Sequence, residues 1–292
     1  MSAPSASRAP LLPKLGVAPS FLLSFLCIYG LIAWNGYLSL SASRLLPNYE
    51  FVGVEQYVRL FESERFHVAL TNMAIFGGVF IGGAMALGLL LAILLDQKIR
   101  VEGLLRTVYL YPMAISFIVT GTAWKWMLNP GLGLEKLMHE WGFTAFAFDW
   151  LVNPDRAIYT IVIAGVWQSS GFVMALFLAG LRGIDDSILK AAQIDGASLP
   201  RIYWRIIIPS LRPVFFSTLM ILAHLAIKSF DLVMALTAGG PGFSTDLPAT
   251  FMYTMAFSRG QIGLGAASAT IMLATVAAIV VPYLYSELRV KK

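Results

Sequence analysis

Residues 66–95, FHVALTNMAIFGGVFIGGAMALGLLLAILL, form an unbroken stretch of 30 residues without a charged side chain. A helix needs about 20 consecutive apolar residues to cross the hydrocarbon core of a bilayer. The whole chain of 292 residues is also strongly apolar: 58% of its residues are hydrophobic and 13% are charged. A soluble domain carries about 25% charged residues. The composition therefore excludes a soluble enzyme, a disordered chain and a secreted disulfide scaffold, and indicates an integral membrane protein.

Five further segments extend this pattern to an all-α, polytopic membrane protein with six transmembrane helices. Four of them are long uncharged intervals, at residues 15–43, 107–124, 157–181 and 260–286. The first could instead be a signal peptide, but it is longer than the roughly 7–15 apolar residues of a signal, so we expect an uncleaved helix. The remaining span, at about 214–236, is interrupted by Lys228 and Asp231. We expect it to be continuous because its 15 uncharged residues alone would leave backbone polar groups unsatisfied in lipid.

The distribution of charges predicts the orientation of the six helices. An even number of spans places both termini on one side, together with the loops at 96–106 and 182–212. That side carries 13 basic and six acidic residues, a net charge of +7, and the other side carries −2. Cytoplasmic loops carry the excess of Lys and Arg, so we expect residues 1–14 to be a cytoplasmic tail and residues 15–292 to form the transmembrane domain. The net charge of +5 then reports orientation, and no nucleic-acid partner is needed to explain it.

The segment 182–213 is the longest cytoplasmic connection, and it is predicted to form two short helices. Asp185 and Asp186 are suited to cap the first helix, Gly196 is suited to end it, and Ser198 offers the next cap. From the residues alone, this hairpin is equally consistent with a knob that docks into a partner and with an interfacial link between two spans. Its second helix carries an apolar face at helical spacing, formed by Leu199, Ile202, Tyr203 and Ile206.

A resemblance to a known family favours docking. Residues 190–197, KAAQIDGA, and the residues that follow resemble the cytoplasmic coupling motif of bacterial ABC importer permeases, E-A-A-x-x-D-G-A followed by an aromatic residue, Ile and Pro. In that family the loop inserts into a cleft of a separate ATPase subunit, so that nucleotide-driven closure moves the membrane helices. The resemblance therefore implies ATPase coupling by Lys190, Ala191, Ala192, Asp195, Gly196, Ala197, Tyr203, Ile206 and Pro209.

The resemblance covers about residues 15–287, and over this range the chain is similar to the carbohydrate branch of the family. The segments that carry it are FVGVEQY at 51–57, WKW at 124–126 and LTAGGPG at 236–242. They look like the maltose/glycerol-phosphate-type first permease subunit, with a glucose or mannose importer as the expected member. This implies an inner-membrane protein of a bacterium that forms half of a pore by alternating access. The implied partners are a second, different permease subunit, an ATPase dimer, a periplasmic sugar-binding protein, the sugar itself and membrane lipids.

One position departs from the family pattern. Lys190 stands where the motif usually has Glu, so a cation replaces an acidic contact to the ATPase. Either the groove on the partner has changed its charge, or neighbouring residues carry the docking.

Several motifs are absent from the sequence, and this argues against catalysis by this chain. No G-x-x-x-x-G-K-[ST] phosphate loop, H-E-x-x-H or G-x-S-x-G sequence occurs, so we expect ATP and Mg²⁺ on the partner ATPase and no cofactor here. The three histidines are scattered and predict no metal site. The alternative function is a stand-alone, ion-coupled secondary transporter, which should have coupling carboxylates within its spans and internal repeats. Asp231 alone gives that alternative little support.

Two further groups are candidate functional residues. Lys228 and Asp231, three positions apart, are predicted to share one helix face, where they either line the solute path or form a self-satisfied pair near the outer interface. The second group is a turn that cannot continue a helix. The turn either contacts the binding protein, as the resemblance implies, or is only a tight turn between two segments. It consists of Gly239, Gly240, Pro241 and Gly242.

Overall fold

The computed structural model describes residues 11–46, 48–97 and 99–290, and within these ranges it is all-helical apart from one isolated β-bridge, Ser41–Phe51. Residues 1–10 of the expected cytoplasmic tail lie outside the described residues, and α1 begins at Leu11. Four helices are long and apolar enough to cross a membrane, and two bent helix pairs raise the number to as many as six. The four are α1 (Leu11–Ser39), α3 (Glu64–Asp96), α7 (Ala157–Arg182) and α14 (Ile262–Val290).

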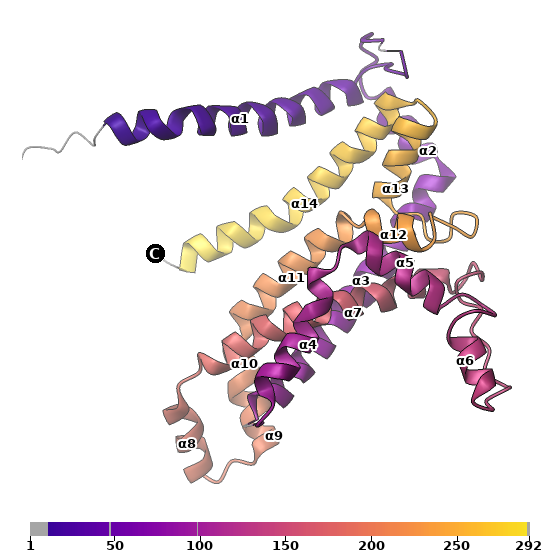
Figure 1. Ribbon diagram of the computed structural model, residues 1–292. Helices are drawn as coiled ribbons and strands as arrows, with labels where there is room; N and C mark the ends of the chain where they lie inside the picture. Colours follow the sequence, from indigo (N-terminus) through magenta and orange to yellow (C-terminus); the bar gives the residue numbers. More distant parts are fainter. Residues whose placement is uncertain (1–10, 47, 98, 291–292) are drawn as a thin grey trace, which may run out of the picture.

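Shorter helices complete the fold (Figure 1). Two lie in loops near the ends of the long helices, α2 (Glu55–Glu62) and α6 (Leu134–Glu140). The others are α4 (Glu102–Ala114), α5 (Phe117–Met127), α8 (Asp186–Ile194), α9 (Leu199–Ile202), α10 (Ile208–Ser210), α11 (Arg212–Ile227), α12 (Asp231–Leu236) and α13 (Pro248–Tyr253). Two single π-helical turns, at Tyr203–Ile207 and Thr254–Ser258, connect α9 to α10 and follow α13.

The third predicted span is sharply bent. The axes of α4 and α5 differ by 100°, because the backbone is extended at Ile115 and Ser116. The Ser116 hydroxyl caps α5 by accepting from the Val119 amide, and the Ile115 carbonyl accepts from Nε2 of Gln168 at 2.7 Å. Satisfying backbone groups in this way allows a helix to break within a membrane protein.

The expectation of one continuous helix over 214–236 is wrong. α11 ends at Ile227, and α12 begins at Asp231 after three non-helical residues. With 16 residues, α11 is about 24 Å long at 1.5 Å per residue, which is shorter than the hydrocarbon core of about 30 Å. Irregular backbone at membrane depth is tolerated only where protein buries it or where it lines a cavity, and α12 packs against α5 and α7.

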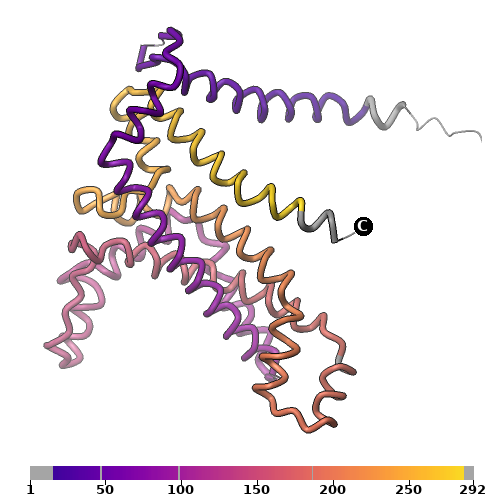
Figure 2. The backbone as a smooth tube through the Cα atoms, turned by 180° about the vertical axis from the view of Figure 1, so that it is seen from behind, coloured from indigo at the N-terminus to yellow at the C-terminus, as the bar shows by residue number. Residues whose placement is uncertain are grey.

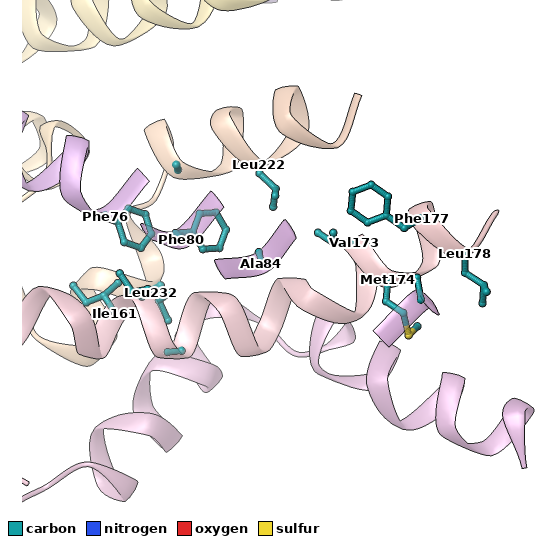
Figure 3. Packing of buried hydrophobic residues seen from close by; sticks show 14 of the residues in the cluster. Phe76, Phe80, Ala84, Ile161, Val173, Met174, Phe177, Leu178, Leu222 and Leu232 are labelled. Carbon is teal, nitrogen blue, oxygen red and sulfur yellow. The ribbon is translucent and has the colours of Figure 1, made fainter. Parts of the chain in front are cut away.

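The main core lies where α3 runs alongside α7, with α11 covering them. Figure 3 shows the interdigitated side chains of this core, from Phe76 and Phe80 at one end to Phe177 at the other. Close approach depends on glycine: a Cβ atom at Gly88 of α3 would lie 2.5 Å from the Val173 side chain of α7.

Helix α1 lies apart from this core. The ribbon and the tube both show it running away from the body of the molecule (Figures 1 and 2), and every residue from Gly16 to Trp34 is exposed. Asn35, near its end, donates from Nδ2 to the Ala266 carbonyl and to Oγ1 of Thr270 in α14. The apolar surface of α1 is thus left for lipid or another subunit.

Candidate functional site

The predicted coupling segment is a helical hairpin at one end of the molecule, with α8 and α9 at the bottom of Figure 1. Asp185 caps α8 as predicted: its carboxylate accepts from the Ser187 amide at 2.8 Å. Hydrogen bonds from the backbone amide and the hydroxyl of Ser187 hold the pKa of Asp185 below its usual value. Gly196 ends α8 with φ of +77°, and the Ala197 amide donates to the Ala192 carbonyl, as in a Schellman motif. Ser198 occupies the predicted cap position of α9, but its side chain makes no capping hydrogen bond.

The hairpin divides its residues between an inner and an outer surface. Ile202 is buried in the main core, and Ala192, Ala197, Tyr203 and Ile206 pack against that core. Much of the apolar face predicted for the second helix therefore packs against the protein's own core. The outer surface carries Lys190, Ala191, Asp195, Gly196 and three exposed apolar side chains, Ile188, Ile194 and Leu199.

The ends of three long elements support this hairpin. Arg182, at the end of α7, donates from Nη2 to Glu102 of α4 at 2.7 Å, and its Nε lies 3.8 Å from Asp96 of α3. Tyr203 packs against the main core, to which Leu95 near the end of α3 belongs. Sequence spacing gave no signal for the two Arg182 contacts because their partners are about 80 to 86 positions away in the chain.

Lys228 and Asp231 are brought together by a helix break rather than by one helix face. The prediction of a shared face is wrong, because α11 ends before Lys228 and Asp231 starts α12. No ion pair joins the two described side chains, and both line a cavity of about 160 Å³. The cavity combines these charges and Ser229 with aromatic and apolar surface from α3, α5, α7, α11 and α12, namely Phe76, Phe80, Phe117, Gly165, Leu225, Phe230 and Leu232.

The glycine-rich turn lies at the other end of the core. Residues 237–247 leave helical structure as predicted, with positive φ at Ala238, Gly239 and Gly242 and a cis peptide bond before Pro241. Gly239 is buried and Gly242 is exposed.

A buried ion pair beside this turn was not predicted. Arg65 Nε of α3 donates to Oδ2 of Asp246 at 2.6 Å, and the two side chains are only 14% and 1% exposed. Both residues stand next to loops in the sequence, which gives no signal that they meet. Within the described residues, no group of three or more His, Cys, Asp or Glu side chains could hold a metal ion.

The long apolar helices define a class: a polytopic membrane protein. Comparison with known proteins places the chain within it. Residues 84–290 match the family described as "Binding-protein-dependent transport system inner membrane component". The chain belongs to this family and is a non-catalytic membrane subunit of a binding-protein-dependent ABC importer of the carbohydrate type.

Two relatives and one solved structure illustrate the match. A probable ABC transporter permease of Pyrococcus horikoshii is 40% identical over 95% of this chain and 97% of its own length. The xylose/arabinose import permease of Haloferax volcanii is 37% identical, covering 91% of this chain and 85% of its own. The fold matches a chain of a bacterial ABC transporter that imports alginate, with a TM-score of 0.83, 20% identity and coverage of 97% and 96%. Since archaeal proteins are among the relatives, family membership establishes a multi-pass membrane location and not a bacterial source.

Proposed function

We propose that this chain is one half of the translocation pore of an ATP-driven importer for a small sugar. A second, different permease subunit would complete the pore, an ATPase dimer would close beneath it, and a periplasmic protein would deliver the sugar. The observation that carries the proposal is the exposed outer surface of the α8–α9 hairpin, because exposed apolar side chains grouped on a rigid element are typical of a protein-binding surface. The match to importer permeases supports this arrangement over a stand-alone secondary transporter.

Docking to the ATPase is proposed for the turn around Gly196. Ala191 and Gly196 have little bulk and are exposed, so that α8 can lie close to a partner backbone, while Ile194 is 86% exposed and available to fill a pocket. Lys190 is also exposed. The cation in place of the family's usual Glu therefore faces the partner, which calls for a neutral or acidic contact there. The residues that pack inward, including Tyr203 and Ile206, would pass movement of the hairpin to the membrane core.

The solute path is proposed to pass the cavity at the α11–α12 break. Aromatic rings offer apolar faces to a sugar, and Lys228, Ser229 and Asp231 offer hydrogen-bond donors and acceptors to its hydroxyls. A glucose or mannose importer is the member that we propose.

The remaining assignments follow from the same topology. Residues 1–14 are proposed as a cytoplasmic tail, residues 15–292 as the permease domain and 182–213 as the coupling loop. The glycine-rich turn, exposed at Gly242, would contact the binding protein, and the uncovered surface of α1 would contact lipid and the second permease. The proposed location is a bacterial inner membrane with both termini in the cytoplasm.

The test is co-purification of the tagged chain with the ATPase and second permease of its own genome. We expect the wild-type chain to retain the ATPase, and Asp195→Lys to lose it and to abolish sugar uptake while remaining inserted. Glu140→Lys, a charge reversal at an exposed position of α6, is the matched control and should retain both. Uptake by the wild type should stop on ATP depletion and continue with an uncoupler. Normal uptake by Asp195→Lys would refute the coupling assignment, and uptake that stops with the uncoupler alone would favour the secondary transporter.

A further inference from the structure

The buried pair Arg65–Asp246 fastens the glycine-rich turn to one end of α3. The Arg65 guanidinium lies 4.3 Å from the ring centroid of Phe243 and 5.8 Å from that of Phe251, and its Nη2 reaches Oγ1 of Thr254. A buried charge is stable only when it is paired and hydrogen-bonded. The position of Asp246 is therefore tied to the position of Arg65.

Other contacts make the attachment specific. Nδ2 of Asn72, two turns further along α3, donates to the backbone carbonyls of Phe243 and Asp246 at 3.1 and 3.0 Å. Inside the turn, the Thr245 hydroxyl donates to the Gly240 carbonyl at 2.8 Å. Through these bonds, Asn72 holds the backbone and Arg65 holds the Asp246 side chain of a segment about 170 to 180 residues later in the chain.

The opposite end of α3 contacts the coupling hairpin. Asp96, its last residue, lies 3.8 Å from Nε of Arg182, the first residue of the coupling segment, and Leu95 belongs to the core against which Tyr203 and Ile206 pack. Figure 1 shows these two regions at opposite ends of the molecule, with α12 and α13 at the upper right and α8 and α9 at the bottom.

Between its ends, α3 is one unbroken helix. Its 33 residues contain no proline and span about 50 Å. Gly83 and Gly88 allow α7 to pack closely along it, since a Cβ atom at either position would meet Val166 or Val173 at 3.1 Å or less. Closely packed helices move as rigid bodies rather than deforming continuously. By contrast, α4–α5 and α9–α11 are both bent.

We propose that α3 is the rigid link between the two partner-contacting regions of this permease, and that Arg65 and Asp246 are positioning residues at its outward end. Movement of the coupling hairpin would reach Asp96, move α3 together with the closely packed α7, and so move the turn at residues 237–247 through Arg65 and Asn72. In the reverse direction, a binding protein on the turn would change the hairpin that faces the ATPase. This inference rests on the proposed function.

The test measures how strongly the sugar-loaded binding protein stimulates ATP hydrolysis by the assembled transporter in nanodiscs. We expect Asp246→Asn to reduce the stimulation at least fivefold, within the usual range of coupling between sites, in a complex that still assembles. Arg65→Lys keeps the charge and should retain more stimulation than Arg65→Gln. Arg156→Gln, which breaks an exposed ion pair away from α3, is the matched control and should be stimulated like the wild type.

A double-mutant cycle distinguishes a link from a local role. If both ends act through α3, adding Asp96→Asn to Asp246→Asn should reduce the stimulation little further, because the link is already broken. Effects that multiply, or normal stimulation of an assembled Asp246→Asn complex, would overturn the proposal for α3. Failure of the wild-type chain to assemble with the ATPase, or to respond to the binding protein at all, would instead refute the proposed function.

Discussion

Gly171 of α7 lies directly against the backbone of Tyr109 in α4, so closely that a Cβ atom at position 171 would overlap the Tyr109 carbonyl oxygen. The neighbouring turn of α7 carries Gln168, which bonds the Ile115 carbonyl at the bend between α4 and α5. Helix α7 thus provides both the space and the hydrogen bond that the bent span requires. A straight α4–α5 helix could not use the same two contacts.

Replacing Gly171 should destabilise the protein. Gly171→Ala forces α4 and α7 apart, which should cost at least the roughly 1–3 kcal/mol typical of overpacking, and Gly171→Leu should prevent folding. Thermal unfolding in detergent measures the effect. Gly82→Ala is the control because a Cβ atom there meets nothing within 4 Å. Equal melting temperatures for the Gly171→Ala and Gly82→Ala variants would contradict the close packing.

At Gly196, bulk and backbone strain should have different effects. The residue has φ of +77° with open space around it, so Gly196→Ala should cost only about 1 kcal/mol of strain and retain most of the sugar uptake. Gly196→Trp adds the same strain and a large ring on the outer surface of the hairpin. We expect it to abolish uptake while the protein stays inserted, as measured by transport assays and membrane fractionation. Equal loss in both variants would indicate strain and not docking.

Lys228→Met and Asp231→Asn should each weaken sugar handling. Each removes a charged group from the cavity at the α11–α12 break, and a lost hydrogen bond to a charged group typically costs about 1.5–3 kcal/mol. We expect a reduction in uptake of roughly tenfold or more and altered discrimination among sugars. Lys136→Met, at an exposed position of α6, should transport normally. If Lys228→Met changes neither rate nor preference, the cavity is not on the solute path.

The cap of α8 should be lost in acid. Because Ser187 lowers the folded-state pKa of Asp185, the carboxylate stabilises the helix at all pH values above its ordinary pKa of 3.8 and stops doing so as the pH falls through the lowered value. The protection of α8 amides from hydrogen exchange, measured relative to the intrinsic rate at the same pH, should therefore fall below pH 3.8. Asp185→Asn caps without titrating and should lack this step, while Asp185→Ala should exchange faster at every pH. Identical pH profiles for wild type and Asp185→Asn would exclude the cap as the cause.

Local sequence predicted the coupling hairpin well. The Asp185 cap and the Gly196 stop each depend on contacts between residues no more than five positions apart, and backbone geometry at this scale is set by the local sequence. The family motif identified the same segment. Whether its residues bind an ATPase depends on a partner, so that role stays a prediction.

The sequence by itself determined the membrane class, the all-helical fold and the approximate position of each span, because the need to bury apolar length in lipid acts on every segment separately. The tertiary structure decided what happens where segments meet. It bent α4–α5 at Ile115, ended α11 before Lys228 and paired Arg65 with Asp246. In each case the decisive contact joins residues far apart in the chain or depends on packing against another helix, which hydropathy and spacing along one segment do not record.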